Sequence, residues 1–310
     1  MQKIALMFAG QGAQQVGMGR DLAEQFPTAK SLFDKANETL GYDLANICFN
    51  GPEAELTKTE HAQPGIYLVS WVAFQLLREK LPHLQFACTA GLSLGEFTAL
   101  AAGGAIAFED GLRVVRARGR FMQEACDVTA GSMAAIIGLE ESATRAVCEQ
   151  AGVQLANLNC PGQLVISGAK EKIEKACELA KAQGAKRALP LAVAGAYHSP
   201  LMESAQPKLS AELARIAVNA PSVPVMSNVT AQPHGAPAEI RARLVEQVTA
   251  SVLWEASMRA LIANGFNLFI ELGPGTALSG FMKRIDKSVQ VLNVADAASL
   301  NATVAALQPQ

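Results

Sequence analysis

One six-residue stretch constrains the fold of this chain more than any other. Residues 91–96 read Gly-Leu-Ser-Leu-Gly-Glu, between a short apolar run at 86–90 and an apolar segment at 97–102. A strand, a G-x-S-x-G turn and a helix in this order form a nucleophile elbow, in which a Cβ on either glycine would collide with the flanking elements. The elbow raises the Ser93 hydroxyl beside a helix N-terminus, where free N–H groups favour negative charge. The bare pattern also occurs in ordinary turns, so the strand and helix around it carry the prediction.

Composition sets the broad class. The chain has 310 residues, 50% of them hydrophobic, which is enough for one large domain with a smaller one attached. Lys plus Arg is 26 and Asp plus Glu is 28, so no basic field indicates a nucleic-acid partner. No apolar stretch reaches the length of a membrane span or of a signal peptide's apolar region, so we expect no membrane partner and a cytoplasmic location. The six cysteines form no CxxC pair, which indicates reduced, buried thiols.

Strand-length apolar runs alternate with segments of helical periodicity, which predicts an α/β fold with a mostly parallel sheet covered on both faces. Pro64 is expected in the first turn of its helix, and Ser199-Pro200 should open another. The large domain is assigned to 1–127 and 197–310. Strands are expected at 3–8, 86–90, 223–226 and 268–272, and helices at 17–25, 28–41, 64–80, 108–125, 276–284 and 297–307.

The stretch 128–196 follows a different order. It reads as strand, helix, strand, strand, helix, strand, which is the order of the ferredoxin-like unit. The sequence therefore predicts a small inserted domain over 128–196. Its strands are expected at 132–138, 153–158, 163–168 and 186–190, and its helices at 140–151 and 170–184.

Arg118 lies on the apolar face of the helix expected at 108–125. Val114, Val115, Phe121 and Met122 share that face at helical spacing, whereas Arg113, Arg116 and Arg120 lie on the other. An inward arginine needs an anionic partner, because an unpaired buried charge is costly. Two partners are possible: a carboxylate of the protein core, or a carboxylate of a substrate held by the guanidinium fork.

A reactive serine needs a general base, and the chain has only four histidines. His83 precedes the elbow strand at its wrong end, His234 sits in a Pro- and Gly-containing loop typical of surfaces, and His61 sits in a polar segment. His198 ends the apolar stretch 189–197 and is the favoured base, although a lone histidine there is more often structural. No Asp or Glu clearly follows a strand between the nucleophile and His198, so a backbone carbonyl or an amide side chain could orient the ring.

Several stretches together resemble the malonyl-CoA:acyl-carrier-protein transacylases, which include stand-alone fatty-acid-synthase enzymes and polyketide acyltransferases. They run in order over nearly the whole chain, so their combination is specific although each is weak. The family fold is an α/β-hydrolase-like large domain with a ferredoxin-like insert, which agrees with the element order. The matching stretches are 8–12, Gln63-Pro64, 91–96, Arg118-Gly119 before Phe121-Met122, 159–163, 197–202, Gln247 before Trp254, and 271–275.

The resemblance implies a role for each matching residue. Ser93 is acylated by malonyl-CoA, His198 is the base and later the acid, and the Gln247 carbonyl holds His198. The backbone N–H groups of Gln11 and Leu94 form the oxyanion hole. Arg118 pairs with the malonyl carboxylate, and the acyl group passes to the phosphopantetheine thiol of an acyl carrier protein without a cofactor or a metal. Further substrate contacts are expected from Gln63, Leu92, Asn159 and Tyr197.

The chain departs from the family pattern at two positions. Leu92 stands where the family usually has His, and Ala9 stands where it usually has Pro. Leu92 therefore puts in doubt any family role of that position. Leu94 and Tyr197 look more like malonyl than methylmalonyl selectors, and the Gly-Leu-Ser-Leu-Gly-Glu form is similar to trans-acting polyketide acyltransferases.

Two rival functions use the same residues differently. A hydrolase that clears stalled acyl groups from carrier proteins would use the same dyad with water as acceptor, but an apolar residue at position 118 would suit it better than Arg118. A non-catalytic docking subunit would not need a complete elbow, base and arginine.

Overall fold

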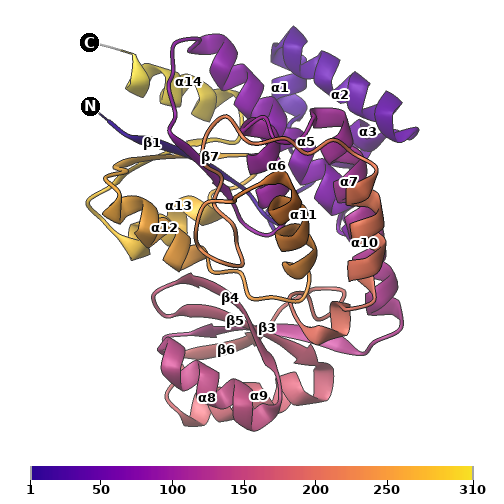
Figure 1. Cartoon of the computed structure of the whole chain (residues 1–310), viewed down its shortest axis with the longest axis vertical. Coiled ribbons are helices and arrows are strands. Elements are labelled where there is room, and N and C mark those ends of the chain that lie inside the picture. The colour runs from indigo at the N-terminus through magenta and orange to yellow at the C-terminus, as the bar shows by residue number, and fades with distance from the viewer. Residues whose placement is uncertain (1, 309–310) are drawn as a thin grey trace.

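The computed structural model describes residues 2–308 and contains two separate sheets (Figure 1). The first sheet is parallel, and its strands lie in the order β2-β1-β7-β8. Every residue of β1, β2 and β7 is buried, as expected of a parallel sheet covered on both faces. The strands are β1 (Ile4–Phe8), β2 (Cys88–Gly91), β7 (Leu268–Leu272) and β8 (Gln290–Val294).

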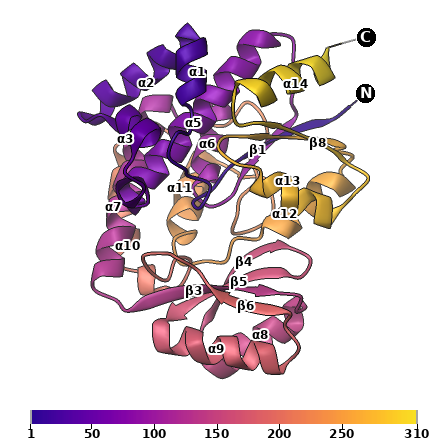
Figure 2. The ribbon, with the colours of Figure 1, turned by 180° about the vertical axis from the view of Figure 1, so that it is seen from behind.

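The second sheet is antiparallel, with the strand order β4-β5-β3-β6. Two helices, α8 (Glu141–Ala151) and α9 (Lys170–Ala182), cover the face that points away from the parallel sheet (Figures 1 and 2). The strands are β3 (Gly131–Ile137), β4 (Gln154–Cys160), β5 (Gln163–Ala169) and β6 (Arg187–Pro190). The predicted α/β class with a mostly parallel sheet and a ferredoxin-like unit is confirmed, while the boundaries at 128 and 196 stay a prediction.

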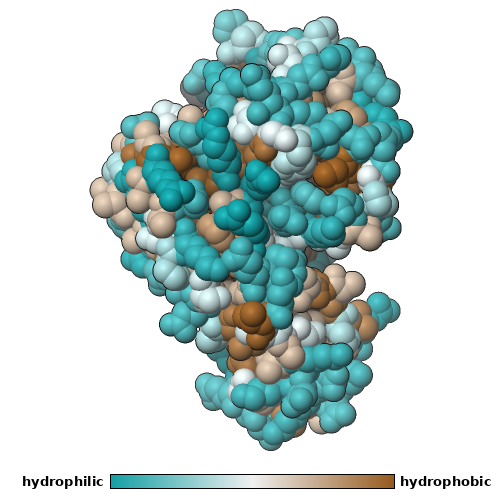
Figure 3. All heavy atoms as spheres, turned by 90° about the vertical axis from the view of Figure 1, so that its right-hand side faces the viewer, coloured by the Kyte–Doolittle hydropathy of each residue, from teal (hydrophilic) through white to brown (hydrophobic). Residues whose placement is uncertain are grey.

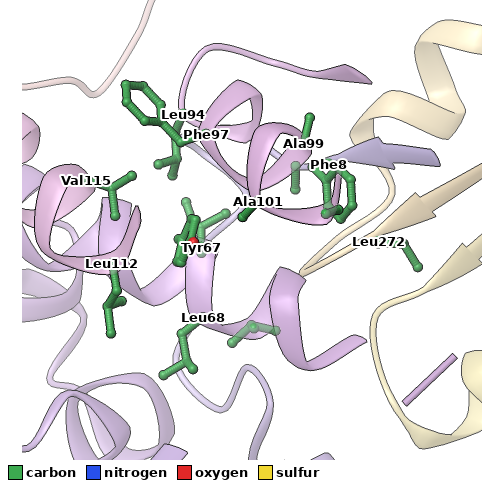
Figure 4. Packing of buried hydrophobic residues seen from close by; sticks show 14 of the residues in the cluster. Phe8, Tyr67, Leu68, Leu94, Phe97, Ala99, Ala101, Leu112, Val115 and Leu272 are labelled. Carbon is green, nitrogen blue, oxygen red and sulfur yellow. The ribbon is translucent and has the colours of Figure 1, made fainter. Parts of the chain in front are cut away.

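The remaining helices surround the parallel sheet. The long α5 and α7 pack against each other, and the elbow helix α6 is buried at all eight of its positions. Figure 4 shows Phe97, Ala99 and Ala101 of α6 in one apolar cluster with Phe8 and Tyr67. These helices are α1 (Arg20–Gln25), α2 (Pro27–Leu40), α3 (Leu44–Asn50), α4 (Glu53–Leu56), α5 (Thr59–Lys80), α6 (Gly95–Ala102), α7 (Phe108–Asp127), α10 (Ala205–Ala214), α11 (Pro237–Glu246), α12 (Trp254–Ala263), α13 (Ala277–Ile285) and α14 (Ala297–Leu307), with a 3₁₀ turn η1 at Pro200–Met202.

Two predicted helix starts and one predicted strand are wrong. Helix α5 begins at Thr59, so Pro64 lies inside the helix and not in its first turn. The helix expected at 17–25 begins only at Arg20, because Gly17 and Gly19 adopt positive φ before it. The stretch 223–226 is not a strand: it makes only two isolated bridges, a parallel one between Val225 and Thr89 at the edge of β2 and an antiparallel one between Met226 and Pro233. By contrast, Ser199 caps η1 as predicted, since its hydroxyl accepts a hydrogen bond from the Leu201 N–H.

The face shown in Figure 3 is mostly hydrophilic, with apolar patches near the narrowing between the larger and smaller parts of the molecule. All six cysteines are free and buried, as predicted. Among residues 2–308, no helix combines the length and the apolar character that crossing a membrane requires.

Candidate active site

Ser93 lies on a sharp turn between β2 and α6. Its φ is 52°, a left-handed value that side-chain-bearing residues rarely adopt and that is typical of a nucleophile elbow. A Cβ on Gly91 would overlap the Gly95 carbonyl group, and a Cβ on Gly95 would overlap the carbonyl oxygen of Phe8. The two glycines are therefore required by the close approach of three backbone segments, as the sequence predicts.

The structure brings His198 to Ser93 from the segment that links β6 to η1. Its Nε2 lies 2.8 Å from Ser93 Oγ, and its Nδ1 lies 2.8 Å from the backbone carbonyl oxygen of Gln247. A carbonyl can only accept, so Nδ1 carries the proton and Nε2 is free to accept the one on Ser93. The Gln247 carbonyl thus occupies the position that a carboxylate fills in a Ser-His-Asp triad.

The surroundings of His198 favour the neutral form of its imidazole ring. Its side chain is buried, and this burial, followed by the positive charge of Arg118, lowers the pKa of the imidazole to about 4. The ring is therefore unprotonated at neutral pH. That is the state in which it can take a proton from Ser93.

Arg118 is 1% exposed and lies directly behind the nucleophile. Its Nη1 donates to Gln63 Oε1 at 2.8 Å, while its Nη2 donates to Gln247 Oε1 at 2.8 Å and to Ser93 Oγ at 3.2 Å. No carboxylate oxygen of residues 2–308 forms an ion pair with Arg118. Of the two partners that the sequence allows, a core carboxylate is therefore not in direct contact with the guanidinium. Burial lowers its pKa to about 10, which leaves the guanidinium charged at neutral pH.

The backbone amides of Gln11 and Leu94 have no hydrogen-bond acceptor among the described residues. Leu94 directly precedes helix α6, and Gln11 follows β1 in the loop packed on the elbow. The contact between the two loops is close, since a Cβ on Gly10 would overlap the Leu92 carbonyl oxygen. Two unsatisfied N–H groups beside a nucleophile have the character of an oxyanion hole.

A pocket of about 400 Å³ opens in front of Ser93, between the two sheets. Leu92, Asn159 and Tyr197 line it, together with Gln11, Ser93 and His198. The Tyr197 hydroxyl lies 2.6 Å from Thr59 Oγ1, whereas the buried Asn159 Oδ1 has no partner among residues 2–308. Gln63, Arg118 and Gln247 lie one layer deeper, behind the pocket wall. A group bound in the pocket therefore meets Ser93 before it meets the guanidinium of Arg118.

The family profile described as "Acyl transferase domain" matches residues 6–307. The chain belongs to this acyl transferase family. The malonyl CoA-acyl carrier protein transacylase of Bacillus subtilis is 44% identical over 315 residues, which cover 100% of this chain and 99% of that protein.

Solved structures agree with this assignment. The malonyl CoA-acyl carrier protein transacylase of Coxiella burnetii is similar with a TM-score of 0.96 at 35% identity, covering 99% of this chain and 98% of that one. A malonyl-transacylase solved in complex with its type II PKS acyl-carrier protein is similar with a TM-score of 0.95 at 38% identity, covering 98% of this chain and 100% of that one.

The acyl transferase site also contains residues to which the sequence analysis gave no role. The Asn228 side chain holds the elbow from behind: its Oδ1 accepts from the Ser93 N–H at 2.6 Å, and its Nδ2 donates to the Gly91 carbonyl at 2.7 Å. His234, predicted in a surface loop, is instead buried against Glu96, and that prediction is wrong. Both residues come from an irregular segment without periodicity, so pattern analysis could not place them.

The described part of this acyl transferase contains no group of three His, Cys, Asp or Glu side chains arranged to hold a metal ion. Its polar groups instead converge on Ser93. The arrangement can therefore activate a hydroxyl, bind an oxyanion and pair with an anion from one pocket.

Proposed function

We propose that this acyl transferase moves a malonyl group from malonyl-CoA to the phosphopantetheine thiol of an acyl carrier protein, through a malonyl ester on Ser93. One observation carries the proposal: Ser93 Oγ lies 2.8 Å from His198 Nε2 and 3.2 Å from Arg118 Nη2. A nucleophile, a neutral base and a cation that can pair with a carboxylate are what the transfer of a diacid acyl group requires. The relatives described above are malonyl transacylases of acyl carrier proteins, which supports the same substrate pair.

In the first half-reaction, Ser93 Oγ attacks the thioester carbonyl carbon while His198 Nε2 takes its proton. The negative charge that forms on the carbonyl oxygen is bound by the amides of Gln11 and Leu94, each contributing about 3 kcal/mol to the lowering of the barrier. The tetrahedral intermediate then collapses, the carbon–sulfur bond breaks, and the imidazolium returns its proton to the departing CoA sulfur. The Gln247 carbonyl stabilises that imidazolium through the Nδ1–H bond.

In the second half-reaction, the carrier's thiol gives its proton to His198 and its sulfur attacks the acyl-serine carbonyl. The same two amides bind the oxyanion. When the ester bond breaks, His198 returns the proton to Ser93 Oγ and the malonyl thioester leaves on the carrier. The cycle has ping-pong order because both thiols use the same base and the same pocket.

Arg118 selects the malonyl group. Its three hydrogen bonds leave two of the five guanidinium N–H donors without an acceptor among residues 2–308, and the bond to Ser93 Oγ is released once that oxygen becomes an ester. The malonyl carboxylate replaces these neutral oxygens with a charged one, which gives a stronger, charge-assisted bond. Gln63, Leu92, Asn159 and Tyr197 shape the space around the acyl group.

We also propose that the protein acts in the cytoplasm, since its six free cysteines suit a reducing compartment. The hydrolase considered from the sequence is the weaker candidate. Its acceptor would be water, and a buried cation would serve no uncharged acyl group.

The proposal is tested by incubating the protein with radiolabelled malonyl-CoA and then denaturing it. We expect label to remain on the wild type, to be absent from Ser93→Ala, and to move to added carrier protein in the native enzyme. Equal labelling of both forms would contradict the acyl-serine. Release of free malonate in place of malonyl-carrier would show the hydrolase.

A further inference from the structure

A fully buried carboxylate lies beneath the elbow, and the proposed mechanism does not use it. Glu96 is 0% exposed and receives three hydrogen bonds. Its Oε2 accepts from the Asn228 backbone N–H at 3.1 Å and from Gln247 Nε2 at 2.6 Å, and its Oε1 lies 2.6 Å from His234 Nε2. Burying a carboxylate without a cation costs much free energy, so its charge requires a reason.

His234 does not supply that cation. Its Nδ1 is buried and has no partner among residues 2–308, and a buried N–H without an acceptor is costly. The ring is therefore assigned as the neutral tautomer with its proton on Nε2, donated to Glu96. All three donors to Glu96 are then neutral groups, so none of them offsets a negative charge on the carboxylate.

A cation, Arg118, lies on the far side of one amide group from Glu96. Gln247 Nε2 donates to Glu96 Oε2, and Gln247 Oε1 accepts from Arg118 Nη2 at 2.8 Å. The reverse orientation of this amide would set its oxygen against the carboxylate and its NH₂ against the guanidinium. Glu96 and Arg118 therefore fix the amide between them, and the amide separates the two charges.

We propose that Glu96 is the buried counter-charge of Arg118, and that the Gln247 amide acts as a spacer which keeps the two from pairing directly. A direct ion pair would compete with the substrate carboxylate, whereas a guanidinium with no counter-charge would lose its proton or destabilise the fold. The spacer arrangement avoids both. Glu96 is a positioning residue in this account, which rests on the proposed selection of malonyl by Arg118.

The titratable groups around Arg118 define a specific readout. Glu96 raises the pKa of Arg118 against the lowering effect of burial, and Tyr197 and His198 are the other titratable side chains that interact with it. Removing the negative charge of Glu96 should lower the pKa of Arg118 further, so that malonyl selection is lost at a lower pH than in the wild type. Acetyl transfer does not need the guanidinium charge and should not change in this way.

The experiment measures kcat/KM for malonyl-CoA and acetyl-CoA at pH 7 and pH 9, and follows the ratio of the two. In the wild type we expect a ratio that is constant within about twofold. In Glu96→Gln, which keeps the size of the side chain, we expect the ratio to fall about tenfold between pH 7 and pH 9, the factor that a lowering of the Arg118 pKa by about two units from its value of about 10 gives at pH 9. Acetyl transfer in the same variant reports that the fold and the dyad are intact.

Two controls separate the possible causes. Glu271→Gln removes another fully buried carboxylate, which accepts hydrogen bonds from the Leu278 and Ser279 N–H groups and from the Ser279 hydroxyl at the start of α13. This variant should leave the ratio constant with pH. In an Arg118→Ala background, Glu96→Gln should have no further effect on the ratio.

A constant ratio in Glu96→Gln, or an equal fall of malonyl and acetyl transfer with rising pH, would overturn the inference. Either result would leave the proposed function standing. A wild type that transfers no malonyl group would instead overturn the proposed function itself, before any variant is compared.

Discussion

The two walls of the pocket are built differently. The parallel-sheet side carries the reactive and charged groups, Ser93 on the elbow and Arg118 on α7, with their hydrogen-bond partners drawn from distant segments. The antiparallel sheet contributes only uncharged side chains to the pocket, from β3, β4 and β5: Met133, Ala135, Asn157, Asn159, Gln163 and Val165. The difference indicates that one wall performs the chemistry and the other limits what fits beside it.

The two walls also differ in how firmly each is fixed. Behind Ser93, backbone segments approach so closely that glycines are obligatory, and Asn228 ties the elbow on both sides. In the opposite wall, β4 pairs with β5 through register shifts on either side of Asn157 and Leu158. A tightly fixed wall suits reacting atoms, and an irregular one can vary with the substrate. Substitutions on the two sides should therefore have effects of different kind and size.

The largest effect is expected at the base. His198→Ala removes the proton acceptor of both half-reactions, so kcat should fall about 10⁴-fold, with the remaining rate coming from oxyanion binding and positioning. Stopped-flow acylation by malonyl-CoA measures it. A loss of less than tenfold would mean that another group takes the Ser93 proton.

Arg118→Ala should lower kcat/KM for malonyl-CoA about 100-fold and leave acetyl-CoA unchanged or improved. The reason is that a charge-assisted bond to a buried carboxylate is worth about 1.5–3 kcal/mol and exists only for the diacid. Competition between the two thioesters for the same enzyme gives the ratio. An equal drop for both substrates would refute the carboxylate contact.

A smaller effect is expected on the antiparallel wall. Asn159→Ala removes a buried amide whose oxygen has no partner in the described structure, and should raise KM about fivefold while kcat stays within twofold. Gln154→Ala, on the same strand but away from the pocket, is the matched control. A fall in kcat/KM for malonyl-CoA of about 100-fold, as large as that expected for Arg118→Ala and caused by a lower kcat, would break the division between the two walls.

The smallest effect is expected from mild acid. Burial and the Arg118 charge lower the pKa of His198 to about 4, so the neutral base persists well below the usual value of 6.5. Acylation should stay within about twofold between pH 7.5 and pH 5.5 and fall only as the pH approaches 4. An ordinary histidine would lose about 90% of its base form at pH 5.5. Circular dichroism at each pH shows that the fold persists.

The sign of this effect can be checked with one variant. Arg118→Ala removes the second cause of the lowered pKa, so the acid limb of its acetyl transfer should move to higher pH. A limb that stays in place would mean that burial alone sets the pKa. The same lowering implies that the folded state is destabilised relative to the unfolded state as the pH falls below 6.5, because the unfolded chain then binds the proton more readily.

Local pattern was sufficient for much of the site. The elbow follows from glycine spacing and the apolar run before it, and the inward position of Arg118 follows from helical periodicity, which its 1% exposure confirms. Elimination among the four histidines predicts His198 as the base, and the structure places it beside Ser93. The same comparison puts His234 on the surface, and that prediction is wrong.

The missed features depend on contacts between distant, irregular segments. Asn228 and His234 lie between α10 and α11, where no repeat of apolar residues marks their orientation. Gln247 follows α11 directly, and its amide contacts Ser93 and Glu96, which lie about 150 positions earlier in the chain. Hydrogen bonds of this kind leave no period in a sequence, so only the assembled fold shows them.

Both reactive residues stand on left-handed backbone, with φ of 52° at Ser93 and 58° at His198. Such conformations cost on the order of 1–3 kcal/mol each for residues other than glycine. A glycine at either position would release that strain and end the reaction. At these two positions, the residue that relieves backbone strain is therefore not the residue that supports catalysis, so stability and activity favour different side chains.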